Sequence, residues 1–175
     1  MQQMLAVLMA MVLLGGTILS VNVLLLDKTT TMMEAEASLT AVSIGQSMLD
    51  EIMTKSYDAV TANGTRIYDS TLFTAANTLG PSAAELSLVP TPDGNNLSEK
   101  WYNDVDDYQG YVRRANTPIL GTFTVKDTVY YVTEANLNLK VNHQTNLKRI
   151  VVTITHPNMS TPVVLQDLVV YRKFF

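Results

Sequence analysis

The apolar run MQQMLAVLMAMVLLGGTILSVNVLLL, at residues 1–26, decides the architecture of this chain. No charged side chain falls between residues 4 and 26, and the first two charges, Asp27 and Lys28, follow directly. As a helix rising about 1.5 Å per residue, this segment spans roughly 34 Å, about the thickness of the hydrocarbon core of a bilayer. The run therefore predicts a helix that lies in lipid or is buried by other protein.

Three interpretations of this helix are open. A cleaved secretory signal is disfavoured, because no Lys or Arg precedes Lys28 and the run is longer than the apolar core of such signals. A simple transmembrane anchor fits the length. The third is a helix that begins in the membrane and is later buried among identical helices in a filament, which requires an apolar surface that continues beyond residue 26.

Residues 27–55 continue the helical pattern without a proline, and Gly45 is tolerable inside a helix at a cost of about 1 kcal/mol. Two apolar stripes at helical spacing lie on different sides of this segment. The chain's own sheet can pack on one stripe, and we expect a second copy of the same helix to pack on the other. The alternative is that the helix is only a tether, on which the additional Ala and Met residues are exposed to solvent and contact no partner. The first stripe comprises Met32, Ala35, Leu39, Val42, Gln46, Leu49 and Met53, and the second comprises Ala37, Ala41, Ile44, Met48 and Ile52.

Adjacent glycines and two polar residues mark the apolar run. Gly15 and Gly16 each forfeit roughly 1 kcal/mol of helix propensity, which predicts a kink or local unwinding there. Ser20 and Asn22 are expected to face neighbouring helices, where polar groups find partners, rather than lipid.

The remainder predicts a globular head. We expect one long helix over residues 1–56, apolar at 1–26 and amphipathic at 27–56, and a head over residues 57–175. Glycine and proline turn signals indicate a wrapping loop region at 57–118, with a short strand at 65–68. Segments 121–133, 147–156 and 162–173 are rich in Val, Ile, Thr and Tyr and predict an antiparallel sheet within residues 119–175. The predicted fold class is α+β, a long N-terminal helix packed on this sheet.

Composition excludes several functions. The formal net charge is −4, with no long basic cluster, so nucleic acid is not an expected partner. The chain has no cysteine, which excludes disulfides, cysteine zinc sites and a thiol nucleophile. His143 and His156 lie in turn settings without catalytic partners. We therefore predict no enzyme activity, no catalytic residue and no cofactor.

The acidic segment NDVDDYQGY at residues 103–111 is a weak calcium candidate through Asp104, Asp106 and Asp107. Its spacing does not match the calcium-binding loop of helix–loop–helix proteins, which places a glycine at position 6 and a glutamate at position 12. Carboxylates that cap the backbone or pair with Arg113 and Arg114 are the favoured interpretation.

The order of parts resembles that of type IV pilins and pseudopilins. The run LTAVSIGQSMLDEIMTKSYDAV, at residues 39–60, is similar to the helix end of many minor pilins and pseudopilins, with its aromatic-Asp pair at Tyr57 and Asp58, and residues 103–111 resemble a loop of pilin-like proteins. The family usually carries a glutamate at the fifth helical position, where this chain has Leu5, so the resemblance indicates a divergent, pilin-like protein.

The resemblance implies a structural subunit of an extracellular, pilus-like bacterial filament. The expected partners are further copies in a helical homopolymer, the inner membrane before assembly, and pilus or secretion assembly machinery. The alternatives are a minor pseudopilin and a single-pass anchored outer domain that binds a ligand. The predicted subunit interface comprises Met4, Leu5, Leu8, Met11, Leu14, Gly15, Gly16, Ile18, Val21, Asn22 and Leu25.

Overall fold

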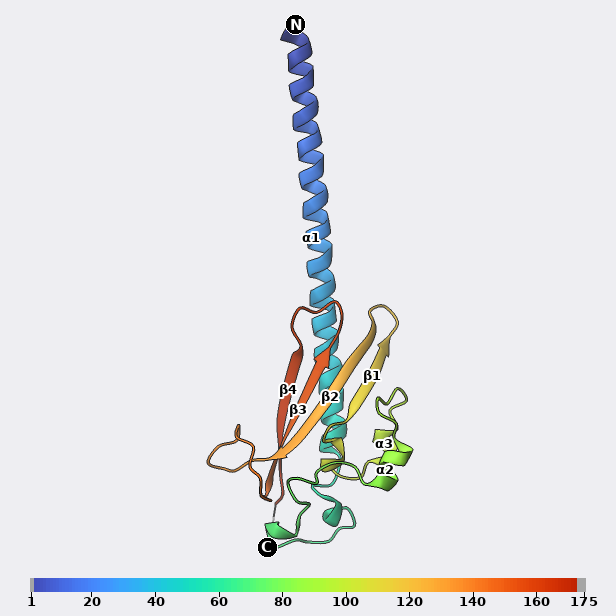
Figure 1. Cartoon of the computed structure of the whole chain (residues 1–175), viewed down its shortest axis with the longest axis vertical. Helices are drawn as coiled ribbons and strands as arrows, with labels where there is room; N and C mark the ends of the chain where they lie inside the picture. Colours follow the sequence, from blue (N-terminus) through green and yellow to red (C-terminus); the bar gives the residue numbers. More distant parts are fainter. Residues whose placement is uncertain (1, 173–175) are drawn as a thin grey trace.

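One long helix and one sheet make up most of the regular structure of the described residues. The computed structural model describes residues 2–172, and its longest element is the helix α1, Gln2–Met53, of 52 residues. The first half of α1 projects as a stalk, and its second half lies along one face of the sheet in the head (Figure 1). The predicted α+β arrangement of a long N-terminal helix packed on an antiparallel sheet is confirmed.

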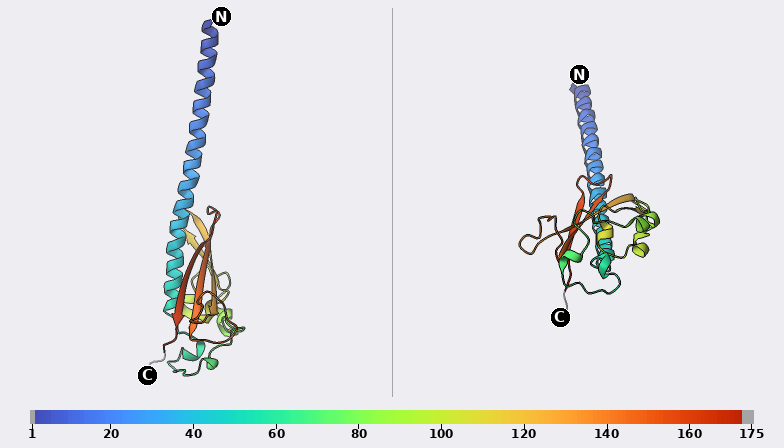
Figure 2. Two further views of the ribbon diagram at one scale, coloured as in Figure 1. Left: turned by 90° about the vertical axis from the view of Figure 1, so that its left-hand side faces the viewer. Right: turned by 60° about the horizontal axis from the view of Figure 1, so that its bottom comes forward.

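The sheet is an antiparallel meander. Its strands follow the chain in the order β1-β2-β3-β4, and each strand pairs with the next. The helix and the sheet form two layers, which are seen edge-on in the left view of Figure 2. The strands are β1 Val112–Thr117, β2 Gly121–Tyr131, β3 Leu147–Thr155 and β4 Val163–Val170.

Alternation along the strands builds the core. Side chains of Ile150, Val152 and Ile154 are completely buried, while the residues between them are partly exposed, as the alternating pattern of this segment predicts. From β2 every second side chain points into the core, and all of these are apolar or aromatic except Asp127. From α1 the core receives the second predicted stripe. The helix residues of this core are Ala37, Ala41, Met48, Leu49 and Ile52, with Ile44 packed against them.

Gly45 lies at the closest approach of α1 to the sheet. A methyl group added at its Cα would lie 2.6 Å from Cδ1 of Ile154 and 2.8 Å from Cδ1 of Leu165. The glycine therefore does more than tolerate its place in the helix, because the absence of a side chain lets the helix backbone approach β3 and β4.

Short helices occupy the connecting region between α1 and the sheet. Ser82 and Glu85 form a capping box at the start of α2, which satisfies backbone N–H groups that lack helical partners. These elements are η1 Ala59–Thr61, η2 Ser70–Leu72, α2 Ala83–Leu88, α3 Ser98–Trp101 and η3 Asp106–Tyr108.

Three local predictions differ from the structure. Residues 65–68 form no strand, and β1 lies within the stretch that was predicted as wrapping loop, so the sheet begins at Val112. The helix runs without interruption through Gly15 and Gly16, so the predicted unwinding is wrong. Hydroxyl groups nearby donate to helix carbonyls, Thr17 to Leu14 at 2.8 Å and Ser20 to Gly16 at 2.9 Å, so polar atoms here are satisfied within the helix.

Candidate functional site

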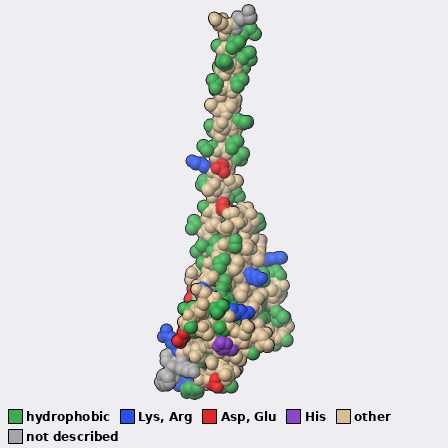
Figure 3. Space-filling view, turned by 60° about the vertical axis from the view of Figure 1, so that its left-hand side comes forward, with side chains coloured by type: hydrophobic (Ala, Val, Ile, Leu, Met, Phe, Trp, Pro, Cys, Tyr) green, Lys and Arg blue, Asp and Glu red, His purple; other side chains and the backbone are tan. Residues whose placement is uncertain are grey.

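The first half of α1 is an apolar surface that the chain itself does not cover. Every residue from 2 to 33 is exposed, and large side chains such as Val12 and Leu13 are 74% and 70% exposed. All eleven residues of the predicted subunit interface lie on this stretch. Hydrophobic side chains follow the length of the stalk in the space-filling view (Figure 3). Exposed apolar surface of this extent indicates burial in lipid or against other protein.

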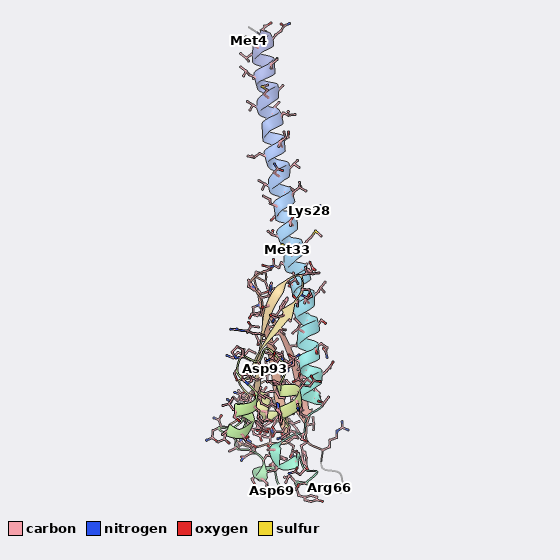
Figure 4. The ribbon with its side chains drawn as sticks, turned by 90° about the vertical axis from the view of Figure 1, so that its right-hand side faces the viewer. Met4, Lys28, Met33, Arg66, Asp69 and Asp93 are labelled. Atoms are coloured by element: carbon pink, nitrogen blue, oxygen red, sulfur yellow. The ribbon has the colours of Figure 1, made fainter. Side chains whose placement is uncertain are left out.

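A charge boundary ends this surface. Asp27 and Lys28 are the first charged residues of the helix, and Lys28 projects from α1 between the stalk and the head (Figure 4). Within the described residues, α1 is the one helix whose length and composition suit a membrane span, and its most apolar window is entirely unburied. The helix is therefore able to anchor the chain in a membrane.

Beyond the boundary, α1 has two different apolar sides. The second predicted stripe faces the sheet, and most of the first faces away from it, with Met32 and Leu39 exposed at 71% and 74% and Val42 and Met53 at 44% and 45%. Leu49 departs from this division, because it is 4% exposed and belongs to the core. The outward stripe, Met32, Leu39, Val42 and Met53, thus continues the apolar surface of the stalk onto the head.

A buried charge cluster joins the end of α1 to the connecting region and β1. Glu51 accepts hydrogen bonds from Arg113, Ser98 and Tyr108, and the Arg113–Glu51 ion pair has an N–O distance of 2.7 Å. Tyr111 donates to Asp93 at 2.8 Å and accepts from Arg113 at 3.0 Å. These partners lie 47, 57 and 62 residues from Glu51 in the sequence, so only the fold brings them to it.

A second cluster encloses Lys148 at the start of β3. Its ammonium donates to the Tyr57 carbonyl at 2.7 Å, to Asp58 at 3.0 Å and to Asp106 at 2.5 Å. Lys148 and Asp58 have no exposed side-chain surface. The cluster therefore ties together the segment after α1, the loop before β1, and the sheet.

The acidic segment caps its own backbone. Asp104 accepts from the amides of residues 106 and 107, and Asp107 accepts from those of residues 103 and 104. The favoured interpretation, carboxylates that cap the backbone or pair with Arg113 and Arg114, is confirmed by the capping, and the ion pair of Asp106 is with Lys148. Among the described residues, no group of three or more His, Cys, Asp or Glu side chains is arranged to hold a metal ion.

Burial perturbs these acids strongly. Loss of solvent, with repulsion from Asp106 and Asp107, raises the pKa of Asp104 to about 9. Burial likewise raises the pKa of Asp107 to about 6, although backbone amides stabilise its charged form. Asp104 thus holds a proton at neutral pH.

Asp127 faces the core from β2 without a partner. It is fully buried between Val125 and Val129, and neither carboxylate oxygen has a hydrogen-bond partner. Burial raises its pKa well above the ordinary value, and the nearby charge of Arg113 offsets this in part. The alternation of β2 places residue 127 inward, so the sequence held a signal for this buried acid.

The histidines take structural positions. His156 stacks on Phe123 at 4.2 Å, its Nε2 contacts the Leu120 carbonyl at 2.8 Å, and its Nδ1 accepts from the Asn158 amide at 3.1 Å. His143 lines a shallow surface depression beside residues 132–135 and 144–147. The structure brings neither histidine together with a serine or acid in a catalytic arrangement within the described residues.

Comparisons with known proteins returned no relative. No protein-family model, curated protein or solved structure matches the chain. The arrangement of a long apolar helix over an antiparallel sheet is compatible with a pilin-like fold, and the uncovered helix is the feature of the molecule that most directly suggests a role.

Proposed function

We propose that this protein is the structural subunit of a pilus-like helical filament on the cell surface, assembled by mutual burial of α1. The observation that carries the proposal is the continuous apolar surface of α1, which runs over residues 2–33 and continues as the outward stripe on the head. A membrane accounts for the stalk alone, because the outward stripe lies beyond Asp27 and Lys28, beside the polar head.

Physical chemistry favours other copies of α1 as the cover. Burial of apolar surface away from water is worth about 25 cal/mol per Å². In the membrane-inserted state the gain for the stalk is smaller, because lipid is already apolar, and close packing at small residues such as Gly15 and Gly16 contributes more. The uncrowded glycines leave room for that packing, since nothing lies within 4 Å of a side chain built at either position. Head-to-tail contacts that do not close into a ring produce open filaments.

The membrane-anchored outer domain is the second candidate. It is favoured by the length of the uncharged run and by the charge boundary at Asp27 and Lys28, which is where a membrane span would meet water. In that case the outward stripe would be surface filler, and the protein would remain in the membrane as single copies.

Electron microscopy of material sheared from the surface of cells that express the chain separates the two. The filament proposal predicts sheared fibres in which this chain is the dominant protein by mass spectrometry. Recovery of the chain in the membrane fraction, with no fibres in the sheared fraction, would contradict it and favour the anchor. Fibres in which the chain is a trace component would instead indicate a minor pseudopilin.

A further inference from the structure

The side-chain amine of Lys148 is buried between the carboxylates of Asp58 and Asp106. Its Nζ lies 2.5 Å from Oδ1 of Asp106 and 3.0 Å from Oδ2 of Asp58, and none of its surface is exposed. The rings of Tyr57 and Tyr131 lie over the same nitrogen, at 4.4 and 5.2 Å to their centroids. An amine and a carboxyl group are thus held in contact away from bulk water.

We propose that Lys148 and Asp106 condense into an intramolecular isopeptide bond that joins β3 to η3. The bond forms between Nζ of Lys148 and Cγ of Asp106, and a C–O bond of Asp106 breaks to release water. Effective concentrations of groups held in this way are very high, and the reaction needs no external reagent.

The hydrogen bonds assign different roles to the two acids that contact Lys148. Asp58 also accepts from the amide of Val60 and from the amide and hydroxyl of Thr74, so other donors hold its two oxygens in place beside Lys148. Asp106 lacks such a set of backbone donors and shares a side-chain hydrogen bond with Asp104. Asp58 is therefore the base that removes a proton from the ammonium, and Asp106 is the carboxyl group that is attacked.

Asp104 supplies the acid. Its carboxyl group is nearly buried, at 2% exposure, and its Oδ1 accepts from the backbone amide of Asp106 at 2.8 Å, which places a proton held by Asp104 close to the carboxyl group that is attacked. The raised pKa of Asp104 keeps that proton in place at neutral pH. An acid, a base, a nucleophile and an electrophile thus occupy one buried cluster.

The proton count closes without a further reactant. The first proton passes from Nζ to Asp58, and the freed amine attacks Cγ of Asp106. Asp104 protonates the departing oxygen, and the second proton lost from Nζ, together with the one held by Asp58, restores Asp104 and completes the water molecule. Asp104 thus delivers one hydrogen of the water and is then reprotonated, so the net reaction takes two protons from the Lys148 ammonium and leaves Asp58 and Asp104 as they began.

The isopeptide bond would replace a buried ion pair in the head by a neutral group. A buried ion pair carries the desolvation cost of both charges, whereas a neutral amide does not. The link would also provide a covalent brace in a chain that has no cysteine for disulfides. This inference concerns the head alone and does not depend on whether the protein forms filaments.

The intact mass of the purified full-length chain in detergent tests the proposal directly. We expect a mass one water below that of the unlinked chain, and a proteolytic digest in which the peptide bearing Lys148 is joined to the peptide bearing Asp106. A chain with the full unlinked mass, whose Lys148 and Asp106 peptides are separate, would show a plain ion pair and overturn the proposal.

A matched pair of variants excludes other losses of water, such as a succinimide at Asp93-Gly94. Lys148→Arg keeps the positive charge but removes the amine nucleophile, so the variant should have its full unlinked mass. Lys126→Arg, at an exposed position of β2, should remain one water lighter. Persistence of the water loss in Lys148→Arg would assign it elsewhere and contradict the isopeptide bond.

Discussion

Asp127 shows how one residue sets a pH dependence of stability. Its raised pKa means that the folded state holds the proton more tightly than the unfolded chain does. The stabilising effect of this proton is complete below the unfolded pKa, near 3.8, and is lost as the pH rises toward the folded value. Asp104 and Asp107 shift in the same direction.

Asp127→Asn removes the ionisable group while keeping the shape of the side chain. We expect the variant to be more stable relative to the wild type at pH 8 than at pH 4, by roughly 1–3 kcal/mol, because it is spared the cost of burying a charge. Urea unfolding in detergent at several pH values measures this difference. An equal offset at every pH would show that Asp127 is not the responsible group, and Asp167→Asn, on the exposed side of β4, serves as the control.

The Glu51–Arg113 pair makes a prediction of the opposite sign. The side chains of Arg113 and Glu51 are 9% and 10% exposed, and Glu51 also accepts from Ser98 and Tyr108. Glu51→Gln leaves Arg113 nearly buried without its counter-ion, so we expect a loss of about 3–5 kcal/mol in the free energy of unfolding. The fluorescence of the single tryptophan, Trp101, followed during urea unfolding, measures this loss of stability. The exposed Glu36→Gln on the same helix should leave the midpoint unchanged, and a similar midpoint for Glu51→Gln would contradict the assigned role.

At the scale of elements, substitutions at two glycines of α1 distinguish helix packing within one chain from helix packing between chains. Gly45→Leu forces a side chain into Ile154 and Leu165, and we expect it to destabilise the head by about 1–3 kcal/mol. Gly16→Leu meets nothing within the chain, so the unfolding midpoint of the isolated protein should not fall.

Filament yield, unlike the stability of the head, is expected to depend on Gly16. If copies of α1 pack closely at residues 15 and 16, Gly16→Leu should reduce the yield of sheared filaments although the head remains folded. Normal filament yield from Gly16→Leu, measured by electron microscopy, would show that these glycines are not at a close contact between helices.

The spacing of apolar residues correctly predicted the buried sides of α1 and β3. The second stripe of α1 and the alternation of Ile150, Val152 and Ile154 each have one strongly apolar side, and these are the sides that the structure buries. β1 was missed because VRRANT lacks alternating apolar residues, so its strand conformation depends on pairing with β2. The kink was wrongly predicted at Gly15 because propensity favours one, whereas the continuing helix satisfies the neighbouring hydroxyl groups.

The charge clusters required the tertiary structure. Alternation alone places Lys148 on the inward side with Ile150, which signals a buried cation. Its partners Asp58 and Asp106 are 90 and 42 residues away in the sequence, and no local pattern connects them to it. The same holds for Arg113 and Glu51, which are 62 residues apart.

For the whole molecule, the outward stripe on the head predicts a variant that folds but does not assemble. Leu39 is 74% exposed in the single chain, so Leu39→Glu should change the stability of the head by less than about 0.5 kcal/mol. In a filament the new charge would be buried without a partner, and filament yield should fall sharply. Ser43→Glu, at an exposed position of α1 that belongs to neither apolar stripe, is the matched control and should assemble normally. Filaments at normal yield from Leu39→Glu would show that the stripe is not an interface.

The filament proposal requires the stalk of one copy to lie against the stalks of other copies in material sheared from the cell surface, and a distance-sensitive label on the stalk tests this most directly. Because the chain has no cysteine, Leu8→Cys carries a single spin label at an exposed position of the stalk. We predict strong dipolar coupling between labels on different copies in the sheared material, and its progressive loss when labelled chains are diluted with unlabelled ones before assembly. Labels that show no coupling beyond that of dispersed monomers would contradict a filament built on α1 and leave the helix as a membrane anchor.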